Sequence, residues 1–141
     1  MFAVLAVLCT GIFAGAAAYV TLVEHPARIE GGAAFALAQF GPSYRRAAVM
    51  QASLAVVGCA AAFLAWLAGA GGAFLVGGLL LGALVPFTLL VIYPVNTRLL
   101  DPALAATPAE ADGLLVRWAR LHAVRSGLSL LAFLLELAHP G

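Results

Sequence analysis

Four long apolar runs dominate the chain and contain few charged side chains. They cover residues 2–23, 47–68, 73–93 and 119–138. Each run is close to the ~20 residues that a helix needs to cross the ~30 Å hydrocarbon core of a bilayer. The runs lack the apolar–polar alternation of a half-buried strand, and backbone groups in lipid must be hydrogen-bonded within the membrane segment. The pattern therefore predicts an all-α integral membrane four-helix bundle in a single domain.

The links between these runs predict the topology. The first link, 24–46, contains three Arg, whereas the turn at 69–72 contains no charge. Because Arg favours the cytoplasmic side, we expect an up-down-up-down bundle with both termini outside, on the periplasmic face of a bacterial inner membrane. The run at 2–23 lacks the basic start of a signal peptide and is interpreted as a retained span.

Prolines predict where the helices end. Pro26 disfavours helical geometry at His25, so the first helix is expected to stop there. A separate short amphipathic helix is then expected around residues 33–40. Several prolines in the link 94–112 argue against a continuous helix in that segment. Pro86 predicts a kink in the third helix.

Composition supports lipid as the solvent. Hydrophobic residues make up 65% of the chain and charged residues 9%, against roughly 25% charged residues in soluble proteins. A lipid bilayer is therefore the expected partner. The seven basic residues are all Arg and are scattered, which gives no basic patch and excludes a nucleic-acid partner. Cys9 and Cys59 lie in apolar runs and are expected to be buried free thiols.

Small residues mark expected helix contacts. One face of the first helix carries Gly11, Gly15, Ala18 and Leu22, and the third helix repeats the spacing at Gly78 and Gly82. Small residues let helix backbones approach closely in membranes. We therefore expect helix–helix contacts along both stripes, which could also support a homo-oligomer.

The fourth helix carries a polar stripe. Its members share one helical face: Trp118, His122, Arg125, Ser129 and Glu136. A basic side chain at the bilayer centre costs roughly 2.5–3.5 kcal/mol on insertion scales, so the stripe is predicted to point into the bundle. In the alternative, Arg125 snorkels to the headgroups and His122 is a satisfied interface residue.

The other helices bring polar side chains to the same level. They are Glu24 and His25 on the first helix, Tyr44, Arg45 and Gln51 on the second, and Asn96 at the end of the third. Their concentration at one end predicts a polar pocket at the cytoplasmic end, open to the membrane interface. His25, His122 and Glu24 could together ligate a metal, although their spacing forms no local ligand motif.

These residues resemble, in order and spacing, the anthrone oxygenase-like family of small four-helix membrane proteins. The resemblance is carried by Glu24-His25-Pro26-Ala27-Arg28, by Pro42-Ser43-Tyr44-Arg45-Arg46-Ala47, by Pro86-Phe87-Thr88 with Pro94 and Asn96, and by Trp118, His122 and Arg125. It implies oxygenation of an anthrone to an anthraquinone by O2, with no evident organic cofactor. The implied substrate is a lipophilic small molecule.

The resemblance also suggests roles for the pocket residues. His122 would act as the general base, and Arg125 and Asn96 would stabilise an enolate or peroxide oxygen. Trp118 would stack on an aromatic substrate, which Tyr44, Gln51 and Arg45 would also contact.

Two other readings of the sequence stay open. One is a metal- or haem-dependent redox protein with His25 and His122 as ligands. The other is a non-enzymatic membrane protein: a lipid- or quinone-binding protein, a transporter subunit or an assembly factor. A cavity beside His122 would favour an enzyme, whereas a polar cluster fully used in interhelical hydrogen bonds would favour the non-enzymatic protein.

Overall fold

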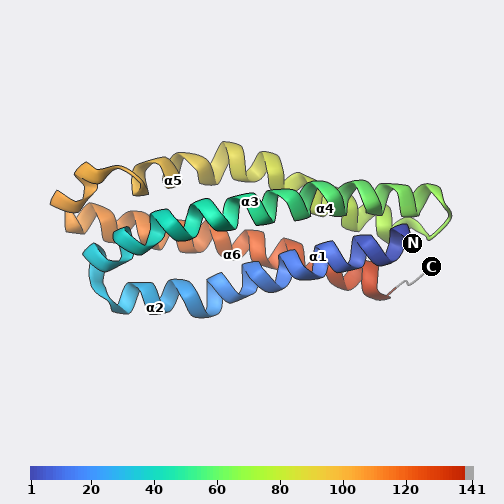
Figure 1. Cartoon of the computed structure of the whole chain (residues 1–141), viewed down its shortest axis with the longest axis horizontal. Helices are drawn as coiled ribbons and strands as arrows, with labels where there is room; N and C mark the ends of the chain where they lie inside the picture. The colour runs from blue at the N-terminus through green and yellow to red at the C-terminus, as the bar shows by residue number, and fades with distance from the viewer. Residues whose placement is uncertain (139–141) are drawn as a thin grey trace.

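The computed structural model describes residues 1–138, and these form a bundle of long helices (Figure 1). In chain order the elements are α1 (Phe2–Tyr19), the π-helical η1 (Val20–Glu24), α2 (His25–Glu30), α3 (Gly32–Leu67), α4 (Gly72–Phe87), the π-helical η2 (Thr88–Ile92), α5 (Tyr93–Leu99), the 3₁₀-helical η3 (Pro102–Ala106) and α6 (Pro108–Ala138). Because α1–η1–α2 and α4–η2–α5 are each continuous, the described residues contain four helices long and apolar enough to cross a membrane. They contain no strand. The predicted all-α four-helix membrane fold is confirmed.

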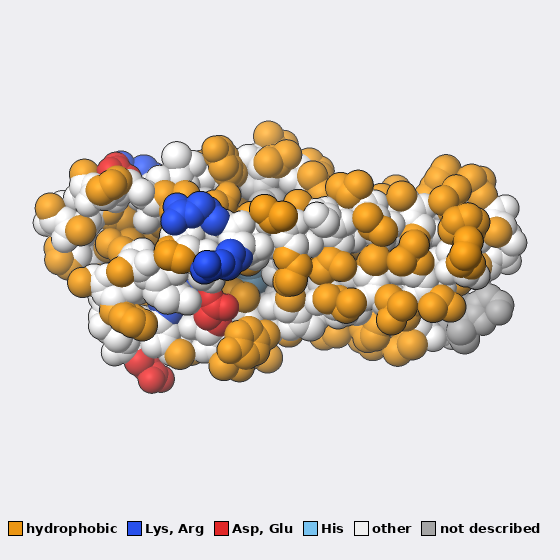
Figure 2. All heavy atoms as spheres, viewed as in Figure 1, with side chains coloured by type: hydrophobic (Ala, Val, Ile, Leu, Met, Phe, Trp, Pro, Cys, Tyr) orange, Lys and Arg blue, Asp and Glu red, His pale blue; other side chains and the backbone are white. Residues whose placement is uncertain are grey.

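The two ends of the bundle differ in chemistry. The start of α1 and the end of α6 lie at one end of the bundle, which we call the terminal end, beside the turn between α3 and α4 (Figure 1). Charged side chains gather towards the opposite end, which we call the charged end, while the visible surface nearer the terminal end is largely apolar (Figure 2). Large apolar side chains such as Leu8, Ile12 and Leu79 are exposed there. An exposed apolar surface of this extent suits contact with lipid.

The buried apolar side chains form three clusters along the bundle. One cluster near the terminal end includes Phe74, a middle cluster includes Phe13 and Leu84, and a third at the charged end includes Phe40 and Trp118. The polar side chains singled out above lie mostly between the middle and charged-end clusters. The core therefore separates the candidate site from the terminal end.

Neither Pro26 nor Pro94 ends its helix. The π-helical η1 comes just before Pro26, where the His25 N–H bonds to the carbonyl of Val20, and η2 comes just before Pro94. Proline lacks an N–H and its ring clashes with the carbonyl four residues earlier. A wider π turn immediately upstream changes the hydrogen-bond partners and accommodates the ring. The expectation that the first helix stops at His25 is therefore wrong.

The helices also extend further at the charged end than the apolar runs suggest. The 36 residues of α3 begin at Gly32 and include Pro42, so the segment 33–40 is part of this helix and not a separate one. At ~1.5 Å per residue, α3 is about 54 Å long, well beyond the ~30 Å hydrocarbon core. The first link shrinks to a tight turn in which Gly32 has φ +83°, a conformation that favours glycine.

The glycine stripes behave differently on the two helices. A Cβ on Gly82 would lie 2.9 Å from the Cys59 sulfur, and one on Gly78 would lie equally close to Ala62, so this stripe packs against α3 as predicted. On α1, Gly11 packs against Phe133, but Gly15 has open space around it. Ala18 is only partly buried, and Leu22 is 74% exposed. Beyond Gly11 the predicted contact stripe on α1 is wrong, because that face turns away from the bundle. Cys9 and Cys59 are both free thiols.

Candidate functional site

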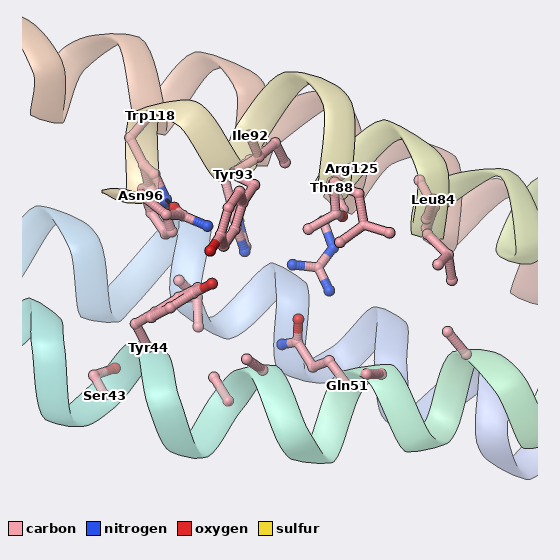
Figure 3. Close-up of a pocket in the computed structure, with 18 of the residues that line it drawn as sticks. Ser43, Tyr44, Gln51, Leu84, Thr88, Ile92, Tyr93, Asn96, Trp118 and Arg125 are labelled. Atoms are coloured by element: carbon pink, nitrogen blue, oxygen red, sulfur yellow. Dashed lines mark hydrogen bonds between the residues drawn. The ribbon is translucent and has the colours of Figure 1, made fainter. Parts of the chain in front are cut away.

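A cavity of about 230 Å³ lies between the middle and charged-end clusters. Its wall is mostly apolar and aromatic, with polar groups from every long helix (Figure 3). The polar and tryptophan side chains that line it are Arg28, Ser43, Tyr44, Gln51, Thr88, Tyr93, Asn96, Trp118, His122 and Arg125. Six of the residues selected from the sequence thus meet at one cavity, namely Tyr44, Gln51, Asn96, Trp118, His122 and Arg125.

The polar stripe of α6 faces into the bundle, as predicted. Trp118 and His122 are buried, and Ser129 and Glu136 have no exposed surface. Arg125 points into the cavity, with its guanidinium carbon 4.9 Å from the centre of the Phe13 ring (Figure 3). Among residues 1–138 it forms no ion pair, and its buried Nε has no hydrogen-bond partner. The cavity therefore contains a positive charge that no carboxylate neutralises.

The cavity reaches the surface between α3 and the η2–α5 segment. Leu89 and Tyr93 line it although more than half of each residue is exposed. Tyr44 from α3 and Tyr93 face each other across this opening, and Gln51 points towards Arg125 deeper inside (Figure 3). A lipophilic molecule could therefore reach the polar groups from the side of the bundle.

Trp118 organises the charged-end wall of the cavity. Its indole N–H donates a hydrogen bond to Asn96 Oδ1 at 2.8 Å. Because the indole nitrogen can only donate, this bond fixes the amide so that its NH2 group remains free to donate elsewhere. The rings of His122 and His25 both pack on the indole, with centroid distances of 4.6 and 4.9 Å. Asn96 and His122 are thus held beside the same indole.

His122 has one ring nitrogen bonded to protein, and its other ring nitrogen has no hydrogen-bond partner among residues 1–138. Its Nδ1 lies 3.0 Å from the hydroxyl oxygen of Thr21 on η1. Among residues 1–138, Nε2 has no hydrogen-bond partner, and the residue lines the cavity. The imidazole is therefore positioned so that Nε2 is available to a bound molecule.

Arg28 also lines the cavity, although it was not among the predicted site residues. It is only 3% exposed, and its Nη2 pairs with Glu24 at 2.6 Å. Gln39 accepts from its Nε, and Ser43 also donates to the Glu24 carboxylate. The remaining nitrogen, Nη1, is buried without a partner among the described residues. Glu24 therefore neutralises the charge of Arg28, whereas Arg125 has no such partner among the described residues. The Nη1 group of Arg28 still has N–H bonds that could be donated to a bound molecule.

Three further wall residues and two residues behind His122 were also not among the predicted site residues. The wall residues are Ser43, Thr88 and Tyr93, and Thr21 and Ser126 lie on the far side of the imidazole. The signal that could have revealed Arg28 is its i,i+4 spacing from Glu24, a pairing that forms only if the helix continues past Pro26.

The residues predicted as metal ligands do not converge. The Glu24 carboxylate is engaged by Arg28, and His25 packs on the Trp118 ring without lining the cavity. Within residues 1–138, no group of three His, Cys, Asp or Glu side chains is arranged to hold a metal ion. The donor set proposed from the sequence therefore does not fit a metal site.

Arg45 also lies away from the predicted pocket. It is exposed and does not line the cavity. Successive residues on a helix point about 100° apart. Since Tyr44 turns into the cavity, its neighbour Arg45 faces the outside.

The fold and cavity together define a class: a four-helix membrane protein with a basic, aromatic-lined chamber that opens sideways between two helices. Residues 40–135 match the anthrone oxygenase family. This match covers more than half of the chain and contains all six predicted residues that line the cavity. The chain belongs to the anthrone oxygenase family.

A curated relative is also named an anthrone oxygenase. The chain is 49% identical over 59 residues to anthrone oxygenase tpcL of Aspergillus fumigatus. The alignment covers 39% of this chain and 36% of that protein, so it spans about a third of the relative's length. No solved structure matches the chain.

Proposed function

We propose that the protein is an oxygenase that uses O2 to convert the ring methylene of a lipophilic aromatic phenol, such as an anthrone, into a carbonyl. The observation that carries the proposal is that His122 and the unneutralised Arg125 line the same aromatic-lined cavity. A base beside a fixed positive charge suits a substrate that becomes an anion during the reaction. Membership of the anthrone oxygenase family supports the same reaction class.

The reaction balances with O2 as the sole oxidant: anthrone and O2 give anthraquinone and water. His122 removes one methylene proton, and the enolate reduces O2 in one-electron steps, forming a C–O bond to a peroxide. The imidazolium protonates the peroxide. His122 then takes the second methylene proton as the O–O bond breaks, which leaves the carbonyl and hydroxide. Hydroxide accepts the proton from the imidazolium and leaves as water.

The cavity residues would stabilise the charge that this sequence creates. The NH2 group of Asn96 is oriented by the bond from Trp118, and the guanidinium of Arg125 already lies in the cavity over the Phe13 ring, which would limit reorganisation during the reaction. A single preorganised donor to an oxyanion contributes about 10²–10³ in kcat in well-studied enzymes. Tyr44 supplies a flat surface against which the fused rings would pack, whereas Trp118, already packed by His122 and His25, would hold Asn96 and His122 in place.

The charged end would lie at the cytoplasmic face, because its Arg residues favour that side. Arg45, Arg46, Arg117 and Arg120 would then lie at the headgroup level, and the termini would lie on the opposite face. Seven residues of α6 separate Trp118 from Arg125, about 10 Å along the helix at ~1.5 Å per residue. The chamber would therefore extend from the headgroups into the outer hydrocarbon layer, and substrate would enter from lipid through the opening beside Tyr93.

The test is turnover of an anthrone by the protein in lipid nanodiscs, followed with an oxygen electrode and by the absorbance of the quinone. Empty nanodiscs measure spontaneous oxidation. We expect one O2 consumed per quinone formed, at a rate well above that control. His122→Ala and Arg125→Met should each lower turnover about 100-fold or more, whereas Arg45→Met, at an exposed position, should not change it.

Two results would contradict the proposal. If His122→Ala and Arg125→Met both turn over at the wild-type rate, the chemistry does not occur in this cavity. If the wild type binds the quinone but oxidises anthrone no faster than empty nanodiscs, the cavity is a binding site of a non-enzymatic protein.

A further inference from the structure

A chain of hydroxyl groups lies behind His122, on the side away from the cavity. His122 Nδ1 is 3.0 Å from Thr21 Oγ1, which is 2.7 Å from Ser126 Oγ. Ser126 Oγ in turn lies 3.0 Å from the carbonyl oxygen of Ala17 and 3.0 Å from that of His122 itself. The chain links α6 to α1 and η1. Neither Thr21 nor Ser126 lines the cavity.

The acceptors at the end of this chain set its direction. A carbonyl oxygen can only accept, and a serine hydroxyl has a single hydrogen. If the Ser126 hydroxyl donates its hydrogen to a carbonyl, it can only accept a hydrogen bond from the Thr21 hydroxyl. Thr21 then uses its own hydrogen on Ser126, so it can only accept a hydrogen bond from His122 Nδ1–H. The reverse order would leave the lone pairs of Ser126 facing two carbonyl oxygens at 3.0 Å with no hydrogen between them. The favoured order therefore runs from His122 Nδ1–H through Thr21 and Ser126 to a backbone carbonyl.

We propose that Thr21 and Ser126 are positioning residues that hold His122 in the Nδ1–H tautomer. In this tautomer Nε2 carries a lone pair, and Nε2 is the nitrogen without a hydrogen-bond partner among residues 1–138, in a side chain that lines the cavity. The neutral imidazole is thus preset as a proton acceptor, whereas the opposite tautomer would present an N–H to the cavity. The kinetic consequence rests on the proposed oxygenase function, but the tautomer does not.

Ser126→Ala separates this role from simple packing. The variant keeps the Thr21–His122 hydrogen bond but removes the group that accepts from Thr21. Thr21 is then free to donate to Nδ1, which moves the imidazole proton to Nε2. Ser129→Ala is the matched control, because Ser129 is buried on the same helix and donates only to the carbonyl of Ser126.

Nitrogen-15 NMR of histidine-labelled protein in nanodiscs reads the tautomer directly, since protonated and unprotonated ring nitrogens resonate far apart. The His122 signals are assigned by their loss in His122→Gln. We expect a protonated Nδ1 and an unprotonated Nε2 in the wild type and in Ser129→Ala, and the reverse in Ser126→Ala. A wild-type His122 protonated at Nε2, or an unchanged spectrum in Ser126→Ala, would overturn the proposal.

Kinetics supply the second readout. Ser126→Ala and Thr21→Val should lower kcat roughly 10- to 100-fold, part of the ~10²–10⁴ that a positioned base contributes. KM should not change, because neither side chain touches the cavity. Thr21→Ser retains the hydroxyl and should restore kcat to within about threefold of wild type, which a purely structural role of Thr21 would not require. Failure of Thr21→Ser to restore the rate, in a protein with a wild-type NMR spectrum, would refute the kinetic role.

The two proposals can fail separately. If the wild type does not oxidise anthrones but its His122 has the expected tautomer, the oxygenase function fails and the tautomer assignment stands. If turnover is present and the tautomer is reversed, the assignment fails and the oxygenase function stands.

Discussion

Replacing Arg125 by Met should make the protein more stable and less active. An arginine at the bilayer centre costs roughly 2.5–3.5 kcal/mol, and Arg125, in the outer hydrocarbon layer, costs less than this. The cation–π contact with Phe13, at 4.9 Å, recovers about 0.5–2 kcal/mol of this. Since no described carboxylate pairs with Arg125, a net cost of up to about 2 kcal/mol remains. Methionine has a similar reach and no charge, so Arg125→Met should raise the free energy of unfolding by that amount.

Reversible unfolding in mixed micelles, titrated with dodecyl sulfate and followed by circular dichroism, measures this change. Turnover of the same preparation should fall about 100-fold, because the charge that stabilises the enolate is lost. Arg45→Met serves as the control and should shift stability by less than about 0.5 kcal/mol, as exposed substitutions usually do. If Arg125→Met is less stable than the wild type, the guanidinium makes contacts that stabilise the fold. That result would refute the interpretation that Arg125 is a destabilising, unneutralised charge kept for catalysis.

Three other substitutions test the packing and the wall of the chamber by the same assays. Gly58→Ala should destabilise the protein by about 1–2 kcal/mol, because its Cβ would lie 2.8 Å from Leu81 and overpacking outweighs the gain in helix propensity; an unchanged unfolding midpoint would contradict this. Gly15→Ala meets nothing within 4 Å and should stabilise the helix by ~0.5–1 kcal/mol. Trp118→Phe keeps the ring but leaves Asn96 Oδ1 without its donor, which should cost about 1–3 kcal/mol and raise KM in steady-state assays.

The fold could be predicted because lipid leaves few alternatives. Apolar runs near 20 residues predict membrane helices, and the absence of Arg from the turn at 69–72, against four Arg in the links 24–46 and 94–112, predicts which ends meet. The helix ends could not be predicted in the same way. Pro26 predicts a helix end because its ring clashes with the carbonyl four residues earlier in an α-helix. A π turn just upstream removes this clash, and the position of such a turn cannot be predicted from the proline alone. Pro26 and Pro94 both follow such a turn.

The site was predictable where a polar residue lay on an apolar helix. His122, Arg125 and Gln51 could be selected because lipid would not accommodate them, and all three line the cavity. Arg28 was not among the predicted site residues because a helix ending at His25 would have left it in a loop. Arg45 was selected because it lies at the same level as the other polar side chains, although its neighbour Tyr44 faces the cavity and adjacent residues on a helix do not share a face. The sequence therefore identified polar residues that would be costly to expose to lipid. It did not show which side chains these residues would contact.

The π turn before Pro26 also has a consequence for how this chain should be aligned with its relatives. A π turn adds one residue to an α-helix without a matching gain in length, so every later side chain is rotated by about 100° relative to an unbroken helix. His25 and Arg28 face inward only with this offset. A relative lacking Pro26 could therefore lack one residue here and still present the same inner face, so a single-residue gap in this segment would preserve the chamber.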